Sequence, residues 1–74
     1  MKTIKMLDTV ALLEDLPEHG LRQGEVGTVV EMFAATPARP GAYLVEFSDR
    51  NGVTYAMPAL AAEKVMPLYH REAA

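Results

Sequence analysis

Turn-forming residues divide this chain at four places, and their spacing limits what it can fold into. The clusters lie at residues 17–20 with Gly24, at 36–41, at 49–52 and at Pro58. The intervals between them suit short β-strands better than packed helices. The chain has 74 residues, so its strands must share one small core. We therefore predict an all-β domain over residues 1–69, followed by a frayed tail at 70–74.

Five β-like runs lie between the turns, at residues 9–13, 25–33, 42–48, 53–57 and 64–68. In the third run Tyr43, Val45 and Phe47 fall on one face, which we expect to point inward. Tyr55 of the fourth run is expected to point inward as well. Gly24 and Gly27 predict a bend or bulge at the start of the second run.

The connections between the runs are equally specific. Asn51-Gly52 favours a two-residue hairpin turn with positive φ at both positions, which pairs the third and fourth runs antiparallel. Pro58 ends the fourth run because it cannot donate to a strand ladder. Residues 59–62 (Ala-Leu-Ala-Ala) predict one 3₁₀ turn, after which the last run joins the sheet as a fifth strand.

This order of strands and loops resembles an SH3-like five-stranded small barrel with one 3₁₀ turn before the last strand. The second and third runs resemble the small barrels of ribosomal KOW motifs. Four segments carry a more specific pattern: Asp8-Thr9-Val10, residues 20–31, Val45-Glu46-Phe47 and Gly52-Val53-Thr54. With these segments the chain resembles, over residues 6–68, a bacterial family of small proteins, the domain of unknown function DUF4926. The resemblance carries no functional residues with it.

Composition excludes several classes of function. The chain has no cysteine, so it has neither disulfides nor thiolate chemistry. A net charge of −3 disfavours nucleic acid as a partner. No apolar run approaches the ~20 residues that a membrane span needs, so we expect no membrane association and a cytoplasmic location.

No set of residues has the spacing of a catalytic or metal site. His19 and His70 lie in a turn and in the tail, without a second histidine or a cysteine at ligand spacing. Ser48 is the only serine and lacks a base and an orienting group nearby in sequence. We therefore predict a protein that is not an enzyme and has no cofactor or metal.

Apolar residues exceed what so small a core can enclose, which indicates a surface for a partner. The candidate surface comprises Leu13, Leu16, Phe33, Met57 and Leu60 with the acidic Glu14, Asp15 and Glu18 of the first long loop. The carboxylates either recognise a basic partner or keep the loop solvated. The predicted function is a non-catalytic protein-interaction module, an accessory or antitoxin-like subunit that docks on a larger protein. A KOW-like RNA-binding barrel is the alternative, although its basic residues are scattered.

Self-association is a further alternative. The first run carries no Lys or Pro within it, so an exposed edge there could pair with a second copy and form a homodimer. The acidic loop opposes such pairing if two copies bring it together.

Overall fold

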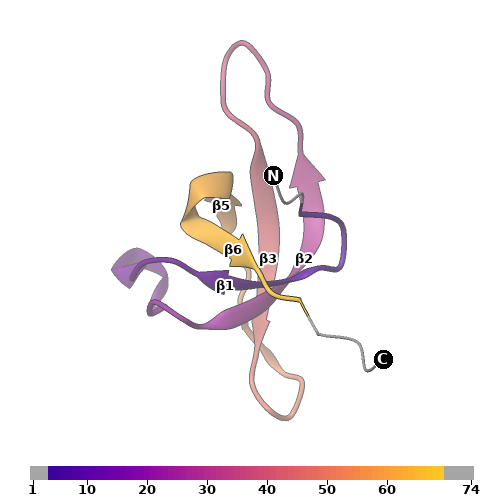
Figure 1. The fold of residues 1–74 in the computed structure, drawn as a ribbon. Coiled ribbons are helices and arrows are strands. Elements are labelled where there is room, and N and C mark those ends of the chain that lie inside the picture. Colours follow the sequence, from indigo (N-terminus) through magenta and orange to yellow (C-terminus); the bar gives the residue numbers. More distant parts are fainter. Residues whose placement is uncertain (1–3, 70–74) are drawn as a thin grey trace.

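The computed structural model describes residues 4–69, which form strands, turns and two short 3₁₀ helices (Figure 1). The strands are β1 (Thr9–Leu12), β2 (Val26–Phe33), β3 (Ala42–Ser48), β4 (Thr54–Ala56), β5 (Ala59–Ala61) and β6 (Val65–Pro67). The 3₁₀ helices are η1 (Pro17–His19) and η2 (Ala62–Lys64). The predicted all-β class is confirmed. The predicted tail at 70–74 lies outside the described residues.

All paired strands are antiparallel, in the order β4-β3-β2-β1-β6, and β5 also pairs with β3. β2 belongs to two layers, because its first residues pair with β1 and the rest pairs with β3. An irregularity between Val29 and Glu31 bends it between the two. β1 and β6 therefore cross in front of β3 (Figure 1). Within residues 4–69 the strand pairing leaves the sheet open rather than closed into a barrel.

The structure has six strands where the sequence predicted five. Residues 59–61 pair with β3 instead of forming a 3₁₀ turn, with Leu60 opposite Tyr43. The pairing of this segment with β3 begins at Pro58, whose carbonyl accepts a hydrogen bond from the amide of Val45 at 3.0 Å. The predicted 3₁₀ turn before the last strand is present, but it begins at Ala62. The last strand pairs with β1.

The core forms between the two layers from side chains that alternate inward along the strands and from apolar residues outside the strands. It contains Ile4, Val10, Leu12, Leu16, Leu21, Val29, Val45, Phe47, Leu60 and Val65. Val45 and Phe47 point inward as predicted, and Tyr43 packs partly buried against the core. The alternation in β3 was therefore assigned to the correct face.

The hairpin between β3 and β4 uses a longer turn than Asn51-Gly52 predicted. Gly52 has a φ of 80°, but Asn51 does not share a positive φ. Asp49 organises the turn: its Oδ1 accepts the amides of Asn51 at 2.8 Å and Val53 at 3.0 Å, and its carbonyl accepts that of Gly52. The turn thus spans residues 49–52 with glycine in the last position. The predicted antiparallel pairing of the two strands is confirmed.

Replacing Gly52 with valine is expected to destabilise the domain by about 1 kcal/mol or more. The cause is the backbone, since a Cβ at this position meets no atom within 4 Å but the φ of 80° disfavours a β-branched residue. Thermal or urea unfolding measures the loss, and Arg50→Val in the same turn is the control. Equal melting temperatures for Gly52→Val and the wild type would contradict the turn described here.

Candidate interaction surface

The structure separates the apolar residues that the sequence had grouped as a surface. Leu16 and Leu60 are only 5% and 4% exposed, so both belong to the core and are withdrawn from the surface. Leu16 is drawn inward because the first loop folds back on itself through the amide of Leu16 and the carbonyl of Leu21, 2.9 Å apart. Leu60 is drawn inward by its place opposite Tyr43 in β5. Leu13, Phe33 and Met57 are exposed as predicted.

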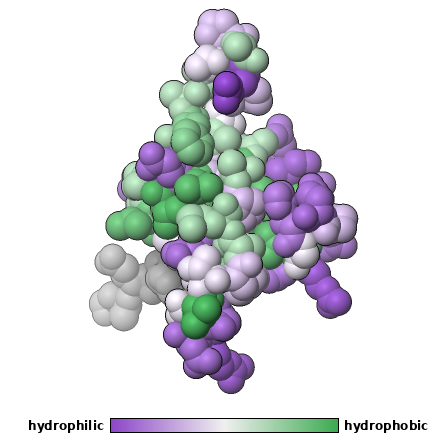
Figure 2. Space-filling model, turned by 180° about the vertical axis from the view of Figure 1, so that it is seen from behind, coloured by the Kyte–Doolittle hydropathy of each residue, from purple (hydrophilic) through white to green (hydrophobic). Residues whose placement is uncertain are grey.

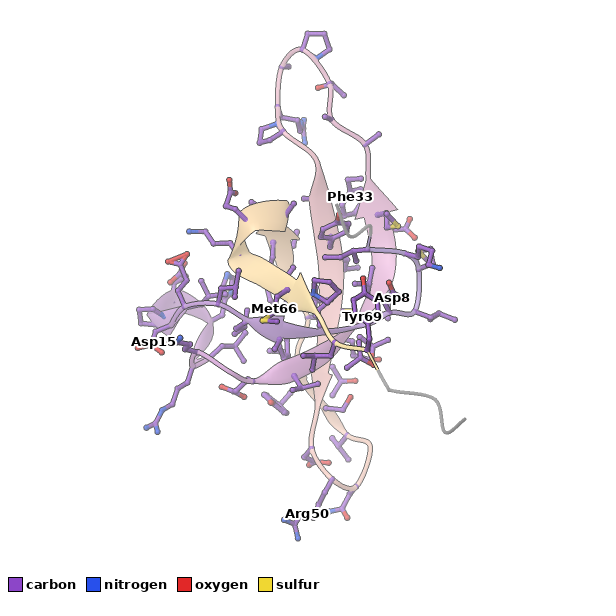
Figure 3. All side chains as sticks on the ribbon, viewed as in Figure 1. Asp8, Asp15, Phe33, Arg50, Met66 and Tyr69 are labelled. Carbon is purple, nitrogen blue, oxygen red and sulfur yellow. The ribbon has the colours of Figure 1, made fainter. Side chains whose placement is uncertain are left out.

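The outer side of the β2-β1-β6 layer presents a continuous apolar face. Val10 and Leu12 of β1 point into the core, so Ala11 between them lies on the opposite side of the strand, where its small side chain is only 9% exposed. Val26 of β2 and Met66 of β6 lie directly opposite Ala11, one on each side, and share its face. Met66 is visible at the middle of the layer in Figure 3.

Two leucines extend this face along β1. Leu13 continues it at one end, where its amide bonds the carbonyl of Lys64, and Leu68 at the other, where its amide bonds the carbonyl of Thr9. Leu13, Val26, Met66 and Leu68 are between 38% and 47% exposed. We call this set the β1 face: Ala11, Leu13, Val26, Met66 and Leu68.

The sequence predicted only Leu13 of the β1 face as a surface residue. The sequence did contain a sign of an apolar outer side on β1. Residues 10–13 are apolar without alternation, and such a strand is apolar on both sides. One side faces the core, and the other side was interpreted as buried as well. The missing residues come from β2 and β6, and only the strand register brings them beside β1.

Carboxylates border the β1 face at the Leu13 end. They are Glu14 and Asp15, which follow Leu13, Glu18 in η1 and Glu63 in η2, and we call them the acidic margin. Figure 3 shows Asp15 at this end of the layer. Lys64 Nζ lies 2.7 Å from Glu14 Oε1, and this ion pair, helped by Glu63 and Glu18, raises the pKa of Lys64. The carboxyl of Asp15 accepts the amide of Gln23 at 2.8 Å and so also shapes the loop.

A second, weaker apolar area lies on the outer side of β2, β3 and β5. The register places Phe33, Ala42 and Ala61 in one row across these strands. Leu44 and Ala59 share the next row with Glu31. Figure 2 shows apolar side chains gathered on the back of the molecule. Three of these residues are alanines and Leu44 is partly buried, so Phe33 is the one large half-exposed side chain of the area.

The histidines and the serine that the sequence analysis considered for chemistry do not come together among the described residues. His19 is exposed at the end of η1, Ser48 is exposed at the end of β3, and His70 lies outside the described residues. Within residues 4–69 no three His, Asp or Glu side chains are placed to hold a metal ion. The described part of the chain also contains no pocket. None of its helices is long and apolar enough to cross a membrane.

Comparison with protein-family models finds a match to the domain of unknown function DUF4926 over residues 6–67. The chain belongs to the DUF4926 family. This confirms the family that the sequence motifs indicated. Neither the curated proteins nor the solved structures contain a match to this DUF4926 chain. The SH3-like barrel therefore stays a prediction.

The free edge that the sequence suggested for the first strand does not exist in this DUF4926 domain. β1 lies between β2 and β6 and pairs with both. A homodimer formed by pairing at β1, one of the alternatives from the sequence, has no edge to use. Any second copy would have to use another surface.

Basic side chains of the DUF4926 domain are spread over separate loops. Arg22 lies after η1, Arg39 between β2 and β3, and Arg50 in the β3-β4 turn. Figure 3 shows Arg50 at the tip of that hairpin, far from Asp15. Since RNA binding needs basic residues on one surface, this placement gives the RNA-binding alternative no support.

Tyr55 points outward, contrary to the prediction. Ala56 pairs with Phe47 and Thr54 with Ser48, so the irregularity at Tyr55 breaks the alternation of β4. The side chain is 51% exposed, and its hydroxyl donates a hydrogen bond to Glu25 Oε1 at 2.6 Å. This bond, with that from the backbone amide of Arg22, lowers the pKa of Glu25. The same carboxylate raises the pKa of Tyr55.

Removing the hydroxyl with Tyr55→Phe is expected to raise the pKa of Glu25 towards its ordinary value of 4.5. Because the pKa of Glu25 is lowered in the folded state, the stability it contributes is present above pH 4.5 and is lost as the pH falls through the lowered value. The stability difference between wild type and Tyr55→Phe should therefore shrink between neutral and acidic pH. NMR titration of the Glu25 carboxyl carbon measures the pKa, with Tyr43→Phe as control. An unchanged titration in Tyr55→Phe would contradict the hydrogen bond.

Proposed function

We propose that this DUF4926 domain is a non-catalytic protein-interaction module of the bacterial cytoplasm. In this proposal it acts as an accessory or antitoxin-like subunit that docks on a larger protein. The docking site is the β1 face. The supporting observation is the exposure of four large apolar side chains, Leu13, Val26, Met66 and Leu68, on one three-stranded layer.

The physical argument concerns the cost of leaving this face in water. Each half-exposed side chain of the β1 face would gain free energy by burial, at about 25 cal/mol per Å² of apolar surface. Scattered apolar residues on a surface need no explanation, but adjacent ones on one layer are typical of an interface. Met66 at the centre suits such a role, because a methionine side chain adapts its shape to a partner.

The proposal is tested by comparing two matched double variants in a pull-down from the native host. The face variant is Leu13→Gln with Met66→Gln, and the control variant is Phe33→Gln with Met57→Gln. Each variant replaces two apolar side chains that are 43% to 48% exposed with a neutral polar one. We expect the wild type and the control variant to recover the same stoichiometric protein, and the face variant to lose it.

Folding of both variants is checked by thermal unfolding, which should show melting temperatures within a few degrees of each other. A protein partner that the face variant retains would contradict the β1 face as the docking site. Recovery of no stoichiometric protein by the wild type would contradict the interaction module itself.

A further inference from the structure

We infer that the partner contributes a basic amphipathic helix that packs across the β1 face. This inference rests on the proposed function and specifies the partner. Three features of the layer support it: strand pairing, dimensions and charge.

The edges of this layer offer a partner strand few backbone amides to pair with. β1 is flanked on both sides, and β2 passes at Thr28 from its pairing with β1 to its pairing with β3. On β6, Met66 pairs with Ala11, so the backbone groups of Val65 and Pro67 point away from β1. The amide of Val65 already donates to the carbonyl of Ala62, and Pro67 has no amide hydrogen. An occupant that binds through its side chains and satisfies its own backbone, as a helix does, therefore suits this layer better than an added strand.

The dimensions of the layer match those of a helix. Three strands about 4.8 Å apart span about 10 Å, which is close to the diameter of a helix with its side chains. Along β1 the face covers five residues, from the level of Leu13 to that of Leu68, or about 13 Å. A helix of about nine residues covers this length, presenting its apolar stripe to the face.

The negative charge beside the β1 face indicates that the partner helix is positively charged. The acidic margin contains four carboxylates, and Lys64–Glu14 is the salt bridge formed by the described residues. Arg22, the next basic side chain, lies beside Glu25, where its charge and backbone amide help lower the pKa of that carboxyl. The margin therefore stays negative, and lysine or arginine on the polar side of the helix would complement it.

The test uses a displayed library of 18-residue peptides. Each peptide has leucine at helical spacing on one side. All of its remaining positions carry either Lys or Glu. The library is selected against the immobilised full-length wild-type chain. We expect Lys-rich peptides to be enriched and their binding to weaken as salt rises. Enrichment of Glu-rich peptides, or no enrichment, overturns the inference, while the pull-down decides the proposed function separately.

Variants then locate the binding of a selected Lys-rich peptide. The face variant, Leu13→Gln with Met66→Gln, should weaken the peptide's affinity at least about tenfold. Glu18→Gln with Glu63→Gln should weaken it about three- to tenfold. Asp15 stays in place because it accepts the amide of Gln23. The control Glu31→Gln, which removes a carboxylate charge away from the acidic margin, should leave the affinity within about twofold.

Two results would contradict the inference in distinct ways. Equal affinity of the wild type and the face variant for the peptide overturns both the helix and the β1 face as docking site. Light scattering that shows a wild-type dimer and a face-variant monomer identifies a second copy as the occupant, and it overturns the basic helix.

Discussion

Phe47→Ala is expected to lower the free energy of unfolding by about 3–5 kcal/mol. The Phe47 side chain is 0% exposed and is the largest fully buried one in the core. Removing the ring leaves a cavity lined by both layers, which a domain this small cannot collapse without moving its strands. A chain of 74 residues has a total stability of about 4–11 kcal/mol. The variant should therefore be largely unfolded or melt far below the wild type.

Leu44→Ala is the matched control for this prediction. Leu44 lies in the same strand, but it points to the outer side of β3 and is only partly buried. Its substitution should cost much less than that of Phe47, since little cavity forms at the surface. Urea unfolding measures both losses. Equal losses would mean that the two faces of β3 are assigned incorrectly.

Gly27→Ala is expected to cost about 2–3 kcal/mol, although it adds a single methyl group. A Cβ at this position would lie 2.6 Å from Val45 Cγ1, 2.9 Å from the Glu46 carbonyl oxygen and 3.0 Å from Phe47 Cδ2. The carbonyl belongs to the paired backbone of β3 and cannot move without disturbing the sheet. Only glycine allows β2 and β3 to approach this closely.

A double-mutant cycle tests that explanation. Val45→Ala removes the atom nearest to the added methyl group, so Gly27→Ala should cost less in the Val45→Ala background than in the wild type. The expected coupling is at least about 0.5 kcal/mol, whereas independent sites add within that margin. The relief should be incomplete, because the Glu46 carbonyl remains. Additive losses would show that the steric contact with Val45 is not the cause.

The glycine and hairpin predictions show what sequence patterns can and cannot establish. Gly27 was interpreted as a bend or bulge, but the irregularity of β2 falls at residues 29–31 and Gly27 serves a close approach. A missing Cβ permits both roles, and only the opposite strand decides between them. Asp49 was overlooked because Asn51-Gly52 already accounts for a turn, while the side chain that organises the observed turn lies two residues earlier.

Strand prediction succeeded where alternation was strong and failed where pairing alone makes a strand. Val45 and Phe47 alternate with more polar positions, so both the strand and its inward side were predicted. Residues 59–61 (Ala-Leu-Ala) have no such preference, and they become β5 because β3 offers an unpaired edge beside them. Tyr55 was assigned to the wrong side because the irregularity in β4 breaks its period of two.

Of the residues predicted for the candidate surface, some are exposed and two are buried. Leu13 and the neighbouring carboxylates lie where the sequence placed them, at the end of the first strand and in the first loop. The prediction that Leu16 and Leu60 are exposed was wrong, because a short chain also uses apolar residues from loops and short strands to complete its core. Val26 and Met66 join Leu13 through registers that involve residues far apart in the sequence.

Pro67 also bears on how one copy of this domain meets another. A chain with a half-exposed apolar face risks aggregation whenever two copies meet, and sheet edges beside such a face usually become templates for fibrils. At the outer edge of β6 the missing amide hydrogen of Pro67 and the amide of Val65, already bonded within η2, interrupt any growing ladder. Encounters of two β1 faces are thereby limited to side-chain contact, which is reversible, and under the proposed function this keeps the face available to a partner.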